Sequence, residues 1–438
     1  MFSLVVGLAI AMTPQEALRP QYHFTAPKGW LNDPNGLVYY RGEYHLFYQH
    51  NPFSTAWGNM TWGHAVSKDL LSWKVLPHAL EPDATGTMFS GSAVVDWENT
   101  SGFGSWKNPP LILLYTAAGG TNEASKGLPF TQGLAYSTDG RKFEKLKANP
   151  VVPHIEHENR DPKVVWHEPT KSWIMALYIN EDRFALFRSP DLKNWTKIDD
   201  VRVASASECP DFFELPLDSD RKKSKWVFWT ANGRYLLGSF DGHKFKPDGE
   251  PIDSTFGAND YAAQTFSEEP EKRRIQISWM RGGNYPGMQF NQQMTLPREL
   301  LLKNTSKGPR LSFRPVAELK KLRKGKVADL GKLPSELLEI RGVFSRVEDA
   351  SIDLGEQSIR YDSGTRTITC MGRSAKLVGD SEEVDLVVYL DRTSIEIFAD
   401  GGFIQFANCF VPKARMESIR SSNIKKLEVW ELRASMTR

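Results

Sequence analysis

Apolar residues occur along this chain in short runs separated by turn residues. Examples are GHAV at 63–66, QGLAY at 132–136 and RFALFR at 183–188. The aromatic content is high, with 13 Trp, 13 Tyr and 24 Phe, and 33 Gly and 26 Pro are scattered between the runs. Aromatic runs broken by Gly, Pro, Asp and Asn are typical of short β-strands, not of long helices. The pattern therefore predicts an all-β protein.

An internal repeat organises the first two thirds of the chain. The pattern S-x-D-(L/G)-x-x-(W/F) occurs four times, beginning at Ser67, Ser137, Ser189 and Ser239, and each copy follows a strand-like run. One copy alone would indicate only an Asp-Leu or Asp-Gly turn. Four copies, spaced by 70, 52 and 50 residues, indicate a repeat architecture.

A second element alternates with this repeat. Polar stretches rich in Asp, Pro and Ser open paired strands at five places, starting at Asn32, Phe89, Arg160, Glu208 and Asn259. Each opening is followed by three or four strand-like runs. Five such units predict a five-bladed β-propeller, in which radial closure protects the strand edges.

The repeat ends after Leu300, and a different pattern follows. Residues 306–332 carry mixed charge and are interpreted as a linker with a short helix. From about Leu333 strand alternation returns with tight turns, which predicts a C-terminal β-sandwich over 333–438. The propeller is assigned to 18–305 and an N-terminal segment to 1–17.

The N-terminal segment contains an apolar run, Phe2 to Met12, of the length of a signal-peptide core, and Ala9-Ile10-Ala11 fits a cleavage site. No Lys or Arg precedes it. A secretion-signal remnant and a frayed terminus both stay open, so we expect an extracellular or periplasmic protein with a cytoplasmic location as the alternative. No run is long enough for a transmembrane helix.

Charge and motif content exclude several functions. With 55 Lys+Arg against 53 Asp+Glu, the net charge is +2, which argues against nucleic-acid binding. Zinc-ligand spacings, a nucleophile elbow, a P-loop and a dinucleotide fingerprint are all missing, so neither metal nor cofactor is expected. Cys209, Cys370 and Cys409 form no disulfide framework, and pairing of the last two stays open, as does the oligomeric state.

Three acidic residues lie at blade openings: Asp33, Asp161 and Glu208. Taken singly, each fits a turn or a surface ion pair. Equivalent repeat positions, however, lie near the same end of the propeller axis, so we expect the three carboxylates to converge in one funnel. Convergent carboxylates without metal ligands suit glycoside hydrolysis. Trp57 and Phe89 stand in loops near these openings and are expected to contact a sugar face.

Six motifs occur in order at fitting distances and together closely resemble the β-fructofuranosidases of glycoside hydrolase family 32, which include invertases, exo-inulinases and levanases. The motifs are WLNDPNG (30–36), FYQHNP (47–52), WGHAVS (62–67), FSGSA (89–93), RDPK (160–163) and ECPDFF (208–213). YAAQTF (261–266), LPREL (296–300) and EIFADGG (396–402) extend the resemblance to most of the chain. The resemblance implies the same architecture as the repeats, a propeller followed by a sandwich.

The resemblance also implies an activity and roles. It implies exo-acting, retaining hydrolysis of terminal β-D-fructofuranosyl linkages in sucrose, inulin or levan. Asp33 would be the nucleophile, Glu208 the general acid/base and Asp161 the transition-state stabiliser, kept ionised by Arg160. The positions that match fructosyl-binding residues of the family are Asn32, Gln49, Trp57, Phe89, Ser90 and Arg160. A fructosyltransferase on the same scaffold and a non-catalytic fructan-binding protein are the alternatives.

Overall fold

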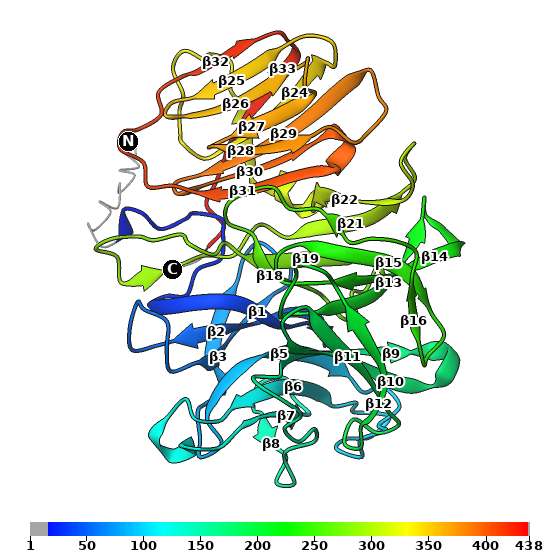
Figure 1. The fold of residues 1–438 in the computed structure, drawn as a ribbon. Helices are drawn as coiled ribbons and strands as arrows, with labels where there is room; N and C mark the ends of the chain where they lie inside the picture. The colour runs from blue at the N-terminus through cyan, green and yellow to red at the C-terminus, as the bar shows by residue number, and fades with distance from the viewer. Residues whose placement is uncertain (1–15, 437–438) are drawn as a thin grey trace.

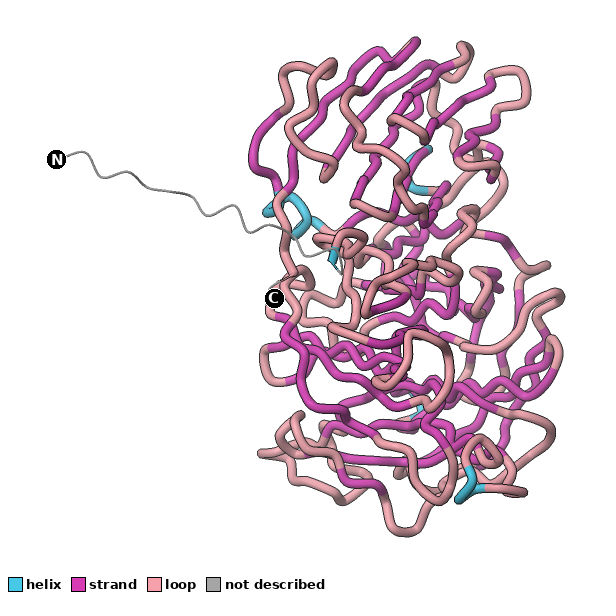
Figure 2. Tube along the Cα trace, turned by 90° about the vertical axis from the view of Figure 1, so that its left-hand side faces the viewer, coloured by secondary structure: helices cyan, strands magenta, loops and turns pink. Residues whose placement is uncertain are grey.

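The structure is a computed structural model that describes residues 16–436 and consists mainly of β-strands. Figure 1 shows two parts, a propeller with strands in blue to green and a sandwich with strands in yellow to red. Figure 2 shows the same stacking from the side, with only short helical turns. The predicted fold class is therefore confirmed. The prediction of a signal remnant concerns residues that, except for 16 and 17, lie outside the described part of the chain.

Each blade is an antiparallel meander, with strands following in chain order. The first is β1 (Gly29–Tyr40), β2 (Glu43–Asn51), β3 (Thr61–Ser67) and β4 (Lys74–Leu80). The second is β5 (Thr87–Val95), β6 (Leu111–Ala118), β7 (Phe130–Ser137) and β8 (Glu144–Lys145). The third is β9 (Arg160–His167), β10 (Ser172–Asn180), β11 (Arg183–Ser189) and β12 (Thr196–Arg202).

The last two blades carry short additions. The fourth is β13 (Asp211–Leu217), β14 (Asp220–Trp229), β15 (Arg234–Phe240) and β16 (Phe245–Pro247), with β17 (Ile252–Asp253) also beside β15. The fifth is β18 (Tyr261–Thr265), β19 (Arg274–Trp279), β21 (Arg298–Lys303) and β22 (Arg310–Pro315). The intervening β20 (Phe290–Asn291) pairs in parallel with β1.

The first strands of the five blades close into a ring. β1 contacts β5, β5 contacts β9, β9 contacts β13, β13 contacts β18, and β18 contacts β1 again. The parallel bridge between Val38 and Ser267 and the parallel pair Leu217–Leu302 link neighbouring blades directly. Because the ring closes, the openings of distant blades meet around one axis.

The repeated S-x-D pattern forms the turn between the third and fourth strands of four blades. In each copy the Asp Oδ1 accepts backbone N–H bonds from two and three residues further on; these Asp residues are Asp69, Asp139, Asp191 and Asp241. The next residue has a positive φ in every copy: Leu70 (64°), Gly140 (67°), Leu192 (64°) and Gly242 (90°). The Leu-or-Gly alternation thus marks a position that needs a left-handed backbone.

The sandwich packs two sheets face to face. One has the order β23-β33-β24-β29-β30-β31 and the other β28-β27-β26-β25-β32. The bounds are β23 (Arg323–Lys326), β24 (Leu338–Ser345), β25 (Ala350–Leu354), β26 (Gln357–Asp362), β27 (Thr367–Cys370), β28 (Arg373–Lys376), β29 (Glu383–Asp391), β30 (Ser394–Ala399), β31 (Ile404–Cys409), β32 (Ile419–Ser422) and β33 (Ile424–Leu432). Cys370 and Cys409 lie in different sheets, and both are free thiols.

The segment interpreted as a linker, 306–332, is structured. β22 pairs with β21 along its length, which places it in the fifth blade and extends that blade to Pro315, beyond the predicted boundary at 305. The 3₁₀ helix η4 (Ala317–Leu322) follows, and β23 pairs with β33. Leu311 and Phe313 are buried on one face of β22 and Arg314 is exposed, but Ser312 is buried as well. The strand therefore lacks a clean alternation, and positive charge surrounds it in the sequence. The other 3₁₀ turns are η2 (Glu123–Ser125), η3 (Glu168–Thr170) and η5 (Asp400–Gly402).

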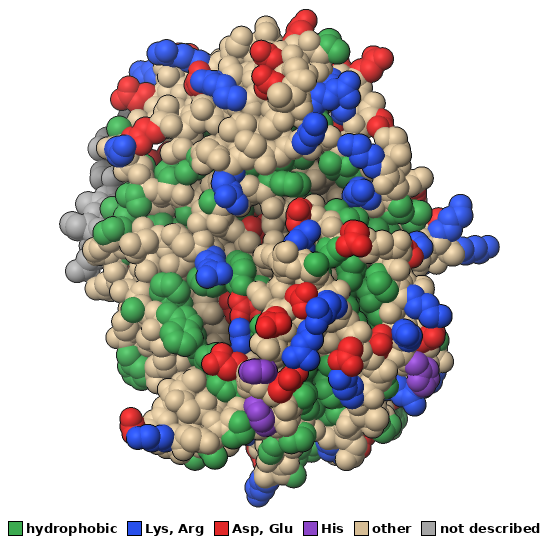
Figure 3. Space-filling view, in the orientation of Figure 1, with side chains coloured by type: hydrophobic (Ala, Val, Ile, Leu, Met, Phe, Trp, Pro, Cys, Tyr) green, Lys and Arg blue, Asp and Glu red, His purple; other side chains and the backbone are tan. Residues whose placement is uncertain are grey.

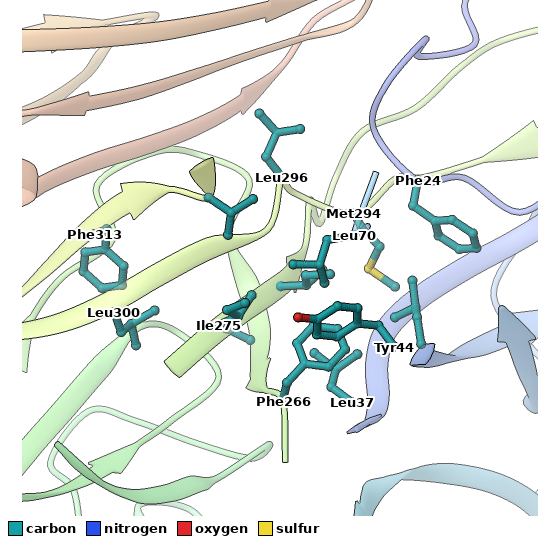
Figure 4. Packing of buried hydrophobic residues seen from close by; sticks show 14 of the residues in the cluster. Phe24, Leu37, Tyr44, Leu70, Phe266, Ile275, Met294, Leu296, Leu300 and Phe313 are labelled. Carbon is teal, nitrogen blue, oxygen red and sulfur yellow. The ribbon is translucent and has the colours of Figure 1, made fainter. Parts of the chain in front are cut away.

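A shared hydrophobic core joins the propeller to the sandwich. It includes Phe24, Leu37, Tyr44, Phe266 and Met294 from the propeller side, which Figure 4 shows packed together. The same cluster continues into the sandwich through Tyr389, Phe398 and Leu432. Burial of large apolar side chains from both parts makes their docking a stable feature of the fold.

Candidate active site

A pocket of about 500 Å³ lies in the propeller, and all nine residues predicted for the site line it. They are Asn32, Asp33, Gln49, Trp57, Phe89, Ser90, Arg160, Asp161 and Glu208. Figure 3 shows acidic and basic side chains gathered around a hollow on this face of the propeller. The predicted convergence of three carboxylates is therefore what the fold produces.

Every blade contributes to this pocket through the start of its first strand. Asp33 lies on β1, Ser90 on β5, Asp161 on β9 and Tyr261 on β18, while Glu208 lies three residues before β13. Asp161 and Glu208 have positive φ values of 65° and 34°. Such backbone is unfavourable for non-Gly residues and concentrates at functional sites, where the surrounding structure holds it.

Cys209 joins two of the carboxylates. Its backbone N–H donates to Asp161 Oδ2 at 3.0 Å, and its Sγ lies 3.3 Å from that oxygen and 3.7 Å from Asp33 Oδ2. Burial, and then the charges of the three neighbouring carboxylates, raise the pKa of the Cys209 thiol well above its usual value. The thiol therefore stays protonated and acts as a hydrogen-bond donor, not as a nucleophile.

Asp33 is held by donors suited to an ionised carboxylate. Ser90 Oγ donates to Asp33 Oδ2 at 2.6 Å. Burial raises the pKa of Asp33, the Ser90 hydrogen bond opposes this, and the Glu208 charge adds to the increase. Its neighbour Asn32 is fixed by Trp30, whose indole N–H donates to Asn32 Oδ1 at 2.9 Å. The site thus orients Asp33, and the Ser90 hydrogen bond favours its ionised form against the effect of burial.

Arg160 favours the ionised form of Asp161, as expected, but offsets the effect of burial only in part. Arg160 Nε lies 3.8 Å from Asp161 Oδ2, whereas Nη2 and Nε donate to Glu208 Oε2 at 2.7 and 3.2 Å. Burial raises the pKa of Asp161 to about 7; Arg160 opposes this, and the charges of Glu208 and Asp33 add to it. One guanidinium cannot offset both the desolvation of this carboxyl group and two neighbouring negative charges.

Glu208 has both carboxylate oxygens engaged. Arg160 occupies Oε2, and the Tyr261 hydroxyl donates to Oε1. Tyr261 received no role in the sequence analysis, although it opens the fifth blade as the other site residues open theirs. The repeat register was the signal that could have identified it. Arg281 stacks over the Tyr261 ring at 4.5 Å and also lines the pocket.

Aromatic side chains border the carboxylates. Trp57 is 57% exposed and meets Phe89 edge to face at 5.9 Å, and Phe89 meets Phe130 at 5.4 Å. Gln49 is buried and lines the pocket beside them. A few convergent polar groups framed by aromatic rings are the ordinary features of a small-molecule site, here one with sugar-like dimensions.

Residues 16–436 contain neither a metal-binding cluster nor a helix that could span a membrane. No cluster of His, Cys, Asp or Glu in this part of the chain is arranged to hold a metal ion. No helix among the described residues has the length and apolarity that crossing a membrane would require.

A propeller with acidic residues converging at its axis and a sandwich docked beside it defines a carbohydrate-active β-propeller enzyme. The family model "Glycosyl hydrolases family 32 N-terminal domain" matches residues 23–315. The levanase of Bacillus subtilis is 36% identical over 92% of this chain and 68% of its own length. The extracellular exo-inulinase of Aspergillus niger is 35% identical over 71% of this chain and 67% of its own length.

The fold comparison agrees with the sequence comparison. The crystal structure of exo-inulinase from Aspergillus awamori superposes with a TM-score of 0.85 and 28% identity, covering 95% of this chain and 99% of that chain. The chain belongs to glycoside hydrolase family 32 and is a glycoside hydrolase. The family resemblance inferred from the motifs is confirmed.

Proposed function

We propose that this protein is an exo-acting, retaining β-fructosidase that releases fructose from the ends of sucrose and fructans. The observation that carries the proposal is the meeting of Asp33, Asp161 and Glu208 in one pocket. Its support comes also from relatives named levanase and exo-inulinase. The extracellular exo-inulinase relative supports an exported protein.

The proposed reaction has two steps. The Asp33 carboxylate attacks the anomeric C2 of the terminal fructofuranosyl unit while Glu208 gives its proton to the departing glycosidic oxygen. Glu208 then takes a proton from water, the water oxygen bonds to C2, and the Asp33 ester bond breaks. Two displacements return the original configuration, so the product retains its anomeric form.

The contacts in the pocket support these roles. Ser90 holds one oxygen of Asp33 and leaves the other oxygen to attack. Arg160 holds Glu208 Oε2, so proton transfer falls to Oε1, which Tyr261 contacts. Asp161 would bind hydroxyl groups of the ring, and those bonds would strengthen as positive charge develops. Asn32, Gln49, Trp57 and Phe89 would complete the fructosyl site.

Product analysis on sucrose, inulin and levan, side by side, tests the proposal. Free fructose is expected as the first product from inulin and levan, and from sucrose together with an equal amount of glucose; NMR of the early products should show the β-anomer of fructose. Release of internal oligosaccharides would refute exo-action, and an inverted first product would refute the two-step reaction. Trisaccharides formed from concentrated sucrose would instead indicate a fructosyltransferase.

Two substitutions test the assigned roles. Glu208→Gln should lower kcat on sucrose by several orders of magnitude but affect an aryl fructoside much less, because a good leaving group needs no acid. Asp33→Asn should abolish trapping of a covalent fructosyl-enzyme. Equal losses on both substrates would remove Glu208 from the acid role, and trapping on another residue would remove Asp33 from the nucleophile role.

A further inference from the structure

The loop between β17 and β18 lies against β31, the edge strand of the sandwich that faces the propeller in Figure 1. Hydrogen bonds join the two at four points: Phe256 N to Gln405 O (3.0 Å), Ala258 N to Asn408 Oδ1 (2.8 Å), Asn259 N to Ala407 O (3.0 Å) and Cys409 N to Asn259 Oδ1 (2.7 Å). A Cβ on Gly257 would lie 2.3 Å from the backbone of Ala407. The two segments are therefore as close as their backbones allow.

Asn259 uses both ends of its amide, and each end serves a different part of the protein. Its Oδ1 accepts from the backbone N–H of Cys409 in the sandwich, and its Nδ2 donates to Arg281 O at 2.6 Å in the propeller. Asn259 is 9% exposed, so these bonds form in a largely dry environment. A buried amide with both of its functions used fixes the relative position of its two partners.

Arg281 continues this connection into the catalytic pocket. Its guanidinium lies 4.5 Å from the centre of the Tyr261 ring, and that ring packs edge to face on Trp279 at 6.2 Å. The Tyr261 hydroxyl donates to Glu208 Oε1. Tyr261, Trp279 and Arg281 form one wall of the pocket, and we call them the Tyr261 wall.

We propose that Asn259 is a positioning residue through which the β-sandwich holds the Tyr261 wall and thereby the Glu208 carboxyl group. The sandwich then takes part in proton donation to the leaving group, although none of its described residues lines the pocket. This inference rests on the proposed role of Glu208 as general acid/base. It predicts that breaking the Asn259–Arg281 bond impairs the acid-assisted step more than substrate binding.

The test compares Asn259→Ala and Asn259→Asp with the unaltered enzyme. Loss of one buried hydrogen bond should lower kcat on sucrose about threefold to tenfold, with KM changed less than twofold and activity on an aryl fructoside nearly retained. Asn259→Asp keeps the acceptor for Cys409 N–H and loses the donor to Arg281 O. Its deficit should shrink at acid pH, where the new carboxyl group is protonated and can donate again.

Asn408→Ala is the matched control. It removes another side-chain bond of the same loop–β31 contact, and Asn408 has no bond to Arg281. Its melting temperature should fall about as much as that of Asn259→Ala, while its ratio of sucrose to aryl-fructoside activity stays that of the unaltered enzyme. If Asn408→Ala changes that ratio equally, or if the Asn259 variants change only stability, the positioning role is refuted.

The Glu208→Gln variant distinguishes refutation of the Asn259 positioning role from refutation of the proposed function. If Glu208→Gln shows the leaving-group dependence and the Asn259 variants do not, only the inference about Asn259 is overturned. If Glu208→Gln lacks that dependence, the assignment of the acid itself is overturned.

Discussion

A buried charge cluster between the two parts of the protein makes a quantitative prediction about stability. His23 precedes β1, and its ring Nδ1 lies 2.8 Å from Asp391 Oδ2 while Nε2 lies 2.9 Å from Glu396 Oε1. All three side chains are buried. Both acids belong to the sandwich, so the cluster ties the N-terminal propeller segment to the second part.

The magnitude follows from the ionisation of His23. Burial lowers its pKa, but the hydrogen bonds and charges of Asp391 and Glu396 outweigh it and raise the pKa from 6.5 to about 9. That difference, at ~1.4 kcal/mol per pH unit, corresponds to about 3 kcal/mol of folding free energy. Because the folded-state pKa is the higher one, this stabilisation is complete below about pH 6.5 and is lost as the pH rises through about 9.

The perturbation is His23→Gln, which keeps a hydrogen-bonding side chain and cannot be charged. Chemical unfolding from pH 6 to pH 10 should show a stability gap between the unaltered protein and the variant of about 3 kcal/mol near pH 6, narrowing toward pH 10. His50→Gln is the control, because burial lowers the pKa of His50 to about 4 and the ring is neutral throughout this range. Above about pH 7.5, where the His50 ring is neutral in the unfolded chain as well, its deficit should not vary with pH. A gap for His23→Gln that is equally constant would refute a charged His23.

Two further predictions concern the pH dependence of activity. Ser90→Ala removes a hydrogen bond that lowers the pKa of Asp33. A bond to a charged group contributes ~1.5–3 kcal/mol, so the acidic limb of kcat/KM should move upward by roughly one to two pH units; an unmoved limb would show that this limb does not report Asp33. The pKa of about 7 for Asp161 predicts that kcat/KM of the unaltered enzyme rises through neutral pH as this carboxyl ionises. Asp161→Asn should remove that inflection and lower kcat/KM about a hundredfold, and an inflection that persists in the variant would assign it to another group.

The blades were predictable because their signals are local. Asp69 and its equivalents bond backbone groups only two and three residues away, so the turn appears directly in the sequence. The second repeated element, the polar blade openings, placed Asp33, Asp161 and Glu208 at equivalent positions. The strand β22 was not predicted from the sequence. It is only six residues long, lies beside a basic segment, and has a buried Ser312 that breaks the alternation of apolar and polar residues.

Local sequence patterns were enough to predict the propeller and the sandwich, because strand alternation and turn chemistry act over a few residues. The equivalence of the repeats was enough to predict that the three acids converge. Only the tertiary structure decided that Arg160 pairs with Glu208, that Tyr261 holds the other oxygen, and that burial brings the pKa of Asp161 to about 7. The Arg160–Glu208 contact joins residues that are 48 positions apart in the sequence, and the Tyr261–Glu208 contact joins residues that are 53 positions apart. The desolvation of a carboxyl group depends on all the atoms packed around it. The distance between side chains from different blades and the exclusion of water from the pocket cannot be predicted from local sequence patterns.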